Sequence, residues 1–389
     1  MKDDFSLVLG GPLFQLWIRA RLTGGALELL RRRVVVLVLL AWVPLLALSL
    51  AAGTAWGSSV ALPFVRDIEL HIRLLLALPL LIVAELVVHQ RMRPVARQFV
   101  ECHLVPDGAR GQFDAAVASL ARWRDSIPAE LLILAFACIV GTGLFGRAQG
   151  ALGVTSWSGS LAVGGTHLSV AGWWLRVVSM PLFQFLLFRW YFRIFLWARF
   201  LWQVSRIKLA IVPTHPDRCG GLGFLSLVNS AFAPLLAAQG MLLAAMIAER
   251  IFYAGAALPQ FAQELAGLVV LMLLAVLGPL LVFTPQLAAA KRAGLRQYGT
   301  LAQRYVSEFD QKWIRAGAPA GEPLLGSADL QSLADMGNSF LVVEGMRPTP
   351  IALKSVIALA VTTLLPILPL TLTMFSPREL LERLIKIVL

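Results

Sequence analysis

Glu85 and His89 have the side-chain types and the spacing to do chemistry inside a membrane. Glu85 stands within the apolar stretch Leu74–Val88, and His89 follows four residues later, so both side chains share one face of a helix. A carboxylate beside an imidazole in apolar surroundings can relay protons or bind a cation. Alternatively, Glu85 lies near the inner interface and reaches toward Arg91 or Arg93. The pair is our first candidate for an ion pathway.

A second unusual segment, from Pro213 to Gly223, joins a long basic helix to the next apolar stretch. Its glycines allow positive φ and close backbone approach, so their N–H groups, together with Arg218, form a candidate anion or regulatory site. It is not a P-loop, because no Gly-Lys-Ser/Thr follows the glycines. Alternatively, the segment is a tight interfacial turn in which Asp217 accepts hydrogen bonds from the backbone. The candidate residues are His215, Asp217, Arg218, Gly220, Gly221 and Gly223.

The apolar stretch Leu222–Ala248 also carries polar residues. Asn229 and Gln239 are candidates to line a water-filled path, or else they hydrogen-bond between helices. Gly240, Ala244 and Ala248 recur every four residues, and such a row of small side chains lets another helix approach closely.

Metal binding and catalysis have little support in the sequence. Cys102, His103, His215 and Cys219 suit zinc by type, but two of them are adjacent and no C-x₂-C pair exists. The chain has no H-E-x-x-H, no G-x-S-x-G and no paired carboxylates in one apolar region. We therefore expect no catalytic residues, no metal site, no cofactor and no enzymatic activity, with a lipid-modifying enzyme as the third alternative.

The composition indicates the class of protein that positions these residues. Of 389 residues, 58% are hydrophobic and 14% are charged, whereas about 25% are charged in soluble proteins. A formal net charge of +12 would favour nucleic-acid binding in a soluble protein, but the sequence has no nucleic-acid-binding motif. We therefore expect a membrane protein in which Lys and Arg determine topology and contact anionic lipid headgroups, with no nucleic-acid partner.

Seven stretches approach the length of about 20 apolar residues that crosses the hydrocarbon core. They are approximately Val34–Ala52, Leu74–Val88, Leu131–Phe145, Val177–Phe195, Leu222–Ala248, Leu265–Phe283 and Ile351–Met374. Lys and Arg are frequent before the first stretch and after the second, fourth and sixth, and rare in the other loops. This alternation predicts a multi-pass protein of the bacterial inner membrane with a cytoplasmic N-terminus. The basic tail leaves the side of the C-terminus open.

The expected fold is an all-α, polytopic transmembrane bundle of about seven helices with a small cytoplasmic helical layer. Its parts are a cytoplasmic arm with an interfacial segment (1–33), a six-helix membrane region (34–283) with cytoplasmic loops 89–127 and 199–221, a cytoplasmic helical segment (284–350), a seventh crossing (351–374) and an amphipathic interfacial helix (375–389). Within the helical segment, Lys291–Arg315 has an apolar stripe, and Ser327 is a plausible cap for the helix that follows.

These features predict a channel or transporter for an ion or small solute. The alternative is a non-transporting membrane scaffold or signalling subunit that docks a cytoplasmic partner or anionic lipid through Lys291–Arg315. If the protein's own helices cover the apolar stripe of that segment, the scaffold interpretation weakens. The expected partners are the lipid bilayer and its anionic headgroups, and self-association into a homo-oligomer is left open.

Overall fold

The computed structural model describes residues 5–19, 30–57, 59–152, 155–162, 165–315, 317, 323 and 326–374. Within this part, six helical runs are long and apolar enough to cross a membrane. They are Leu30–Ala51, Ile68–Glu101, Val170–Val204, Gly223–Ala254, Leu258–Arg315 and Leu353–Met374. The chain is therefore an α-helical, multi-pass membrane protein.

The predicted count of seven crossings is not confirmed by the described residues. The third predicted crossing, Leu131–Phe145, falls in α6 (Ile127–Leu152), whose described apolar part, Ile127–Gly141, is shorter than the six long runs. This part of α6 nevertheless directs large apolar side chains outward, including Leu132 and Ile139. The predicted interfacial helix at 375–389 lies outside the described residues.

Prolines interrupt several of the long runs. The second run consists of α3 (Ile68–His71) and α4 (Leu78–Glu101) joined by the π-helical turn Ile72–Ala77. Pro79 lies in the first turn of α4, and its missing N–H removes one bond of the α-helical ladder. The irregular turn therefore follows from the proline.

The same arrangement recurs elsewhere in the membrane region. In the Val170–Val204 run, α7 (Val170–Trp174) and α8 (Met180–Val204) are joined by the π-helical turn Leu175–Ser179. A 3₁₀ segment, Gly223–Phe232, precedes α9 (Ala233–Ala254), and both α8 and α9 carry a proline in their first turn. The last run pairs α13 (Leu353–Leu364) with the 3₁₀ segment Leu365–Met374.

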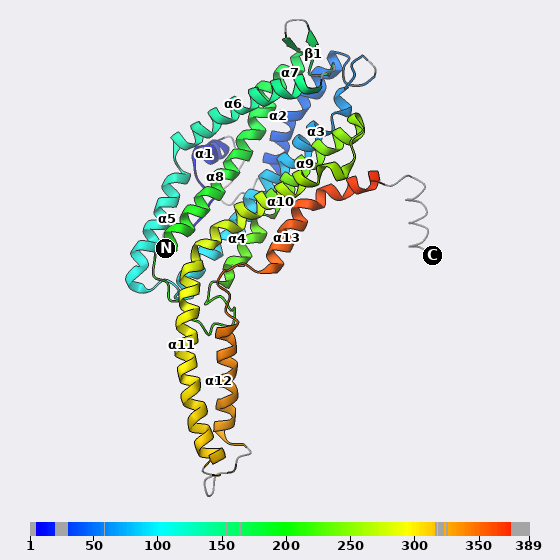
Figure 1. Ribbon diagram of the computed structural model, residues 1–389. Helices are drawn as coiled ribbons and strands as arrows, with labels where there is room; N and C mark the ends of the chain where they lie inside the picture. Colours follow the sequence, from blue (N-terminus) through cyan, green and yellow to red (C-terminus); the bar gives the residue numbers. More distant parts are fainter. Residues whose placement is uncertain are drawn as a thin grey trace.

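The bundle has two distinct ends (Figure 1). At one end, β1 (Gly159–Ala162) and β2 (Gly165–Leu168) form a two-stranded antiparallel ribbon. The opposite end, here called the basic end, holds α5 (Arg110–Arg124) and the 205–222 loop. Between the ends, α4, α8 and α9 pack around a large buried core that includes Phe99, Trp197 and Phe232. α2 (Leu30–Ala51) packs on α4 and α7, and α6 packs on α8.

The predicted row of small residues on α9 is confirmed as a helix-packing surface. A Cβ atom on Gly240 would lie 2.0 Å from the carbonyl oxygen of Thr363 in α13. Ala244 and Ala248 are buried in a cluster that also contains Ile367. α13 and the segment after it therefore lie against α9 at a distance that only small side chains allow.

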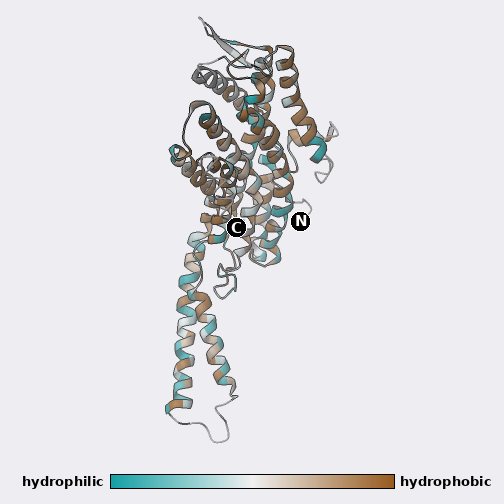
Figure 2. Ribbon diagram, turned by 90° about the vertical axis from the view of Figure 1, so that its right-hand side faces the viewer, coloured by the Kyte–Doolittle hydropathy of each residue, from teal (hydrophilic) through white to brown (hydrophobic). Residues whose placement is uncertain are grey.

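A long helical hairpin extends beyond the basic end. α10 (Ala262–Leu277), the 3₁₀ segment Gly278–Phe283, α11 (Thr284–Phe309) and the π turn Asp310–Arg315 belong to one run of 58 residues. At 1.5 Å per residue this run is about 87 Å long. α12 (Ala328–Glu344) returns antiparallel to α11, and Figure 2 shows hydrophilic residues gathered on this hairpin while the bundle is mainly hydrophobic.

α12 packs against the predicted apolar stripe of Lys291–Arg315. Tyr305 donates to the carbonyl oxygen of Asp329 at 3.0 Å, and Trp313 and Lys312 donate to the Asp329 carboxylate at 2.9 and 2.8 Å. The predicted cap is confirmed, since the Ser327 side chain accepts a hydrogen bond from the N–H of Leu330. Trp313 is buried and the other residues of the stripe are half-buried, so the stripe packs partly within the hairpin.

Candidate functional site

Glu85 is buried and paired with three arginines from two other helices. Its Oε1 accepts hydrogen bonds from Arg193 (2.7 Å) and Arg189 (3.4 Å) of α8, and its Oε2 accepts one from Arg33 of α2. The alternative in which Glu85 reaches toward Arg91 or Arg93 is therefore wrong. Those arginines lie about two turns further along α4, and Arg91 donates to the hydroxyl of Ser230. Interhelical partners replace the local ones.

A second carboxylate extends this group of charges. Arg189 Nε lies 2.9 Å from Glu130 Oε1, in the first turn of α6, and the other oxygen of Glu130 accepts the N–H of Leu13 at 2.8 Å. We call the set of side chains the ion-pair cluster; its members are Arg33, Glu85, Glu130, Arg189 and Arg193. The cluster connects α2, α4, α6 and α8.

The ion-pair cluster is shielded from water. Relative exposure is 2% for Arg33, 5% for Glu85, 6% for Arg189 and 3% for Arg193. Arg189 and Arg193 are four residues apart and therefore lie on one face of α8, the face that meets α4. Moving a charged group from water into the protein costs free energy unless an opposite charge lies beside it. An arginine cannot avoid this cost by losing its proton. The arginines on α8 thus require the carboxylates that face them.

His89 lies one helical turn from Glu85 and contacts the N-terminal segment instead of the cluster. Its Nδ1 lies 3.0 Å from the hydroxyl oxygen of Ser6. The same oxygen accepts the N–H groups of Val8 (3.1 Å) and Leu9 (2.8 Å). Glu85 and His89 share a helix face, as predicted, but have separate partners.

The N-terminal segment packs over the cluster. Phe5, Leu7, Val8 and Trp17 are buried, and Arg124 of α5 donates to the carbonyl oxygen of Ser6 at 2.7 Å. The segment continues into α1 (Pro12–Arg19), whose first turn contacts Glu130 through the N–H of Leu13. Residues 5–19 are thus held by hydrogen bonds to α4, α5 and α6, and they shield the charges from one side.

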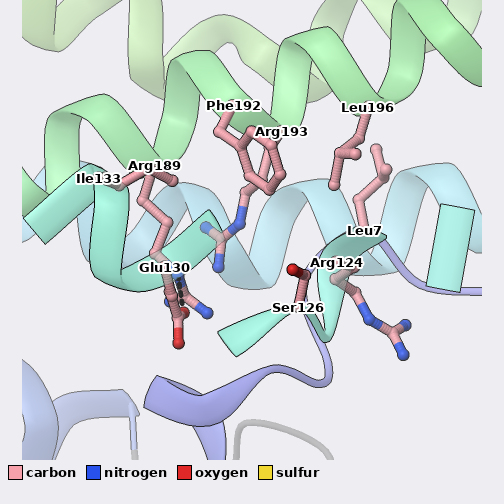
Figure 3. Close-up of a pocket in the computed structure, with 9 residues that line it drawn as sticks. All are labelled: Leu7, Arg124, Ser126, Glu130, Ile133, Arg189, Phe192, Arg193 and Leu196. Atoms are coloured by element: carbon pink, nitrogen blue, oxygen red, sulfur yellow. Dashed lines mark ion pairs between the residues drawn. The ribbon is translucent and has the colours of Figure 1, made fainter. Parts of the chain in front are cut away.

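A small cavity remains beside the cluster. It is lined by Leu7, Arg124, Ser126, Glu130, Ile133, Arg189, Phe192, Arg193 and Leu196 and has a volume of about 10 Å³. Figure 3 shows Arg189 directed at Glu130, Arg193 reaching between Glu130 and Ser126, and Arg124 pointing away. This is the space of about one water molecule. The cavity is therefore too small for an open pore.

The other two predicted pathway residues do not join the cluster. Gln239 is buried on α9, and its side-chain nitrogen has no hydrogen-bond partner among the described residues. The side chain of Asn229 lies outside the described part of the structure. Their role along a path stays a prediction.

The 213–223 loop contains the hydrogen bonds that the turn interpretation predicts. One oxygen of Asp217 accepts the N–H groups of Cys219 (2.7 Å) and Gly221 (3.2 Å), and the other accepts the N–H of Gly223 (2.7 Å). His215 Nδ1 lies 2.8 Å from the same carboxylate. The backbone donors that would hold an external anion are therefore occupied by Asp217.

The loop is also anchored to the segment after α12. The N–H of Arg347 donates to the carbonyl oxygen of Arg218 at 2.7 Å, and its guanidinium donates to the carbonyl oxygen of Asp217 at 3.2 Å. Gly220 and Gly221 have positive φ values of 63° and 96°, as predicted for the glycines of this loop. The loop is therefore a tightly bonded junction between α8, α9 and the end of the hairpin.

Asp217→Asn should destabilise the folded protein by about 1–3 kcal/mol, because an amide has a single acceptor oxygen for three backbone donors. Burial raises the pKa of Asp217, but the hydrogen bonds from Cys219, Gly223 and Gly221 outweigh it, so the pKa lies below its ordinary value of 3.8. The carboxylate therefore stabilises the fold above pH 3.8 and loses this effect as the pH falls through the folded pKa.

The measurement is thermal unfolding of the purified protein against pH, with the exposed Asp114→Asn on α5 as control. Equal melting temperatures for Asp217→Asn and wild type across the pH range would contradict this account of the loop.

The residues considered for zinc do not converge. Cys102 is exposed, whereas Cys219 is buried and its Sγ lies 3.7 Å from the carbonyl oxygen of Thr349. Within the described ranges, no three His, Cys, Asp or Glu side chains are grouped so that they would hold a metal ion.

Comparison of the chain with protein-family models, with curated proteins and with solved structures gives no match.

Proposed function

We propose that the chain is an ion-transporting protein of the bacterial inner membrane and that its path passes the ion-pair cluster. The observation that carries the proposal is the burial of Glu85 among three arginines between membrane-spanning helices. A buried ion pair adds little stability compared with well-packed apolar residues of similar size. Ionisable residues inside membrane bundles commonly mark ion pathways. A functional role therefore explains why these charges are buried better than a contribution to stability does.

The broken helices support the same proposal. Irregular turns interrupt α3–α4 at Ile72–Ala77 and α7–α8 at Leu175–Ser179, the two runs that carry Glu85 and its α8 partners. Such interruptions in membrane helices free backbone groups and permit bending. In this proposal the structure is a closed state, in which residues 5–19 cover the cluster and leave a cavity of about 10 Å³. Displacement of that segment would admit water to Glu85.

The charge pattern supports one orientation of the chain in the membrane. The basic end carries the arginine-rich α5 and the basic α11, and Lys and Arg favour the cytoplasmic side. We propose that this end and the N-terminal segment face the cytoplasm. Anionic lipid headgroups would then meet the exposed arginines at this end.

The alternative function is a scaffold or signalling subunit, and the hairpin is the observation that favours it. The run of 58 residues carries α11 well beyond the bundle, where α12 is its principal contact. Because α12 packs against the apolar stripe of Lys291–Arg315 and leaves it half-buried, the stripe has less free surface for a partner, and this weakens the alternative.

Ion flux in proteoliposomes tests the proposal. The purified protein is assayed with a panel of cations and anions and with a proton gradient, beside empty liposomes. We expect flux for at least one ion, reduced at least about tenfold in Glu85→Gln, because the amide cannot pair with the arginines. Glu264→Gln, an exposed carboxylate at the start of α10, is the matched control and should keep wild-type flux.

Flux that is equal in Glu85→Gln and wild type would remove the cluster from the path. No flux from folded, inserted protein for any ion would favour the scaffold alternative instead.

A further inference from the structure

The ion-pair cluster has more positive than negative charge. Among the described residues it contains three guanidinium groups and two carboxylates. Arg124 does not change this excess of positive charge, because it forms its own ion pair with Asp125. Arginine stays protonated in proteins, so the cluster cannot become neutral by losing a proton. One positive charge is therefore left without a counter-charge among the described side chains.

An unused donor accompanies the unmatched charge. Arg33 Nη2 is bonded to Glu85, but Arg33 Nη1 is buried without a hydrogen-bond partner in the described part of the chain, and the residue is 2% exposed. A water molecule could satisfy a donor but would leave the charge uncompensated. A buried, unpaired charge is expensive enough that an anion bound close by is the simplest way to remove the cost.

The cavity beside the cluster is suited to such an ion. Arg189 and Arg193 border it from α8, and Ser126 lies at the start of α6, a helix of 26 residues whose N-terminal end favours negative charge. Glu130 also borders the cavity, but Arg189 and the N–H of Leu13 already compensate its carboxylate. The volume of about 10 Å³ excludes phosphate, sulfate and organic acids.

We infer that the ion-pair cluster binds one monovalent anion of halide size, in the cavity between Arg189, Arg193 and Ser126. Chloride is the anion of this size and charge that is abundant around cells. The inference does not depend on transport, since a bound halide would neutralise the cluster in a transporter and in a scaffold alike.

Thermal unfolding with exchanged anions tests the inference. The detergent-purified protein is melted in sodium gluconate with increasing chloride or bromide at constant ionic strength. A ligand that binds only the folded state raises its melting temperature in a saturable way. We expect a rise of at least about 2 °C for both halides in the wild type, and Arg176→Gln, outside the cluster, should show the same rise.

Two charge variants make the test specific. Arg33→Gln brings the cluster to neutrality and should abolish the halide-dependent rise, although Arg33 does not border the cavity. Glu85→Gln increases the excess of positive charge and should enlarge the rise. Direct binding of radioactive chloride to wild-type protein by equilibrium dialysis, with about one site per chain, is expected as well, and this measurement does not depend on the folding of any variant.

An absence of both halide stabilisation and chloride binding in the wild type would overturn the inference. A halide-dependent rise that persists in full in Arg33→Gln would also overturn it, since the charge argument would then have failed. Because these are binding measurements, their failure is distinct from a failure to observe ion flux.

Discussion

Glu85→Leu should lower the free energy of unfolding by about 3–5 kcal/mol, because it leaves three buried guanidinium groups with Glu130 as their remaining carboxylate. Leucine is apolar and has a volume similar to that of glutamate. The loss of unfolding free energy therefore reports the unpaired guanidinium groups rather than an empty cavity. The effect is read from thermal or denaturant unfolding of the purified protein. Glu264→Leu, which removes an exposed carboxylate at the start of α10, should be close to neutral.

A second substitution separates charge from packing in this experiment. If unpaired arginine is the cause, Glu85→Leu combined with Arg193→Leu should be more stable than Glu85→Leu alone. A double variant that is less stable than either single variant would show that shape, not charge pairing, dominates at this position.

Gly240→Val should be the most damaging substitution on the helix-packing surface of α9. The first added carbon would lie 2.0 Å from the carbonyl oxygen of Thr363 and 3.0 Å from its carbon, so α13 must move away. Overpacking of this kind costs about 3 kcal/mol. Gly267→Val on α10 is the matched control, because no heavy atom lies within 4 Å of a Cβ placed there.

Melting temperature and the yield of folded protein from membranes measure this effect. A Gly240→Val protein as stable as Gly267→Val would mean that α13 does not pack against α9 as described.

The membrane class and most helices of this fold are predictable from the sequence, because they depend on local composition. Runs of apolar residues predict the six long helices. The cap at Ser327 is a local signal and is also found in the structure. The third predicted crossing, Leu131–Phe145, is not confirmed, since the described apolar part of α6 has only the length of a short helix.

The ion-pair cluster depends on pairs that are distant in the chain. Glu85 meets Arg193, which is 108 residues away, whereas the sequence alone favours the neighbouring Arg91 and Arg93. A usable signal does exist, because Arg189 and Arg193 lie within the apolar stretch Val177–Phe195, where unpaired arginine is costly. Glu85 is the acidic residue deep in an apolar stretch, so matching these charges would have predicted their contact.

The part played by the N-terminal segment has no such signal. Ser6 contacts His89 across 83 residues, and a single serine in a mainly apolar segment is not unusual in any way. The 213–223 loop illustrates a related difficulty. Its sequence is compatible both with a cradle of backbone donors for an anion and with a turn closed by Asp217, and the structure shows the turn.

Ion flux in proteoliposomes, extended to a variant without residues 2–9, shows whether an ion path passes the cluster and is closed by the N-terminal segment. At equal amounts of folded protein, we expect flux that is highest in the shortened protein, lower in the wild type and near that of empty liposomes in Glu85→Gln. Equal flux in the three proteins, or no flux above empty liposomes in any of them, would contradict it.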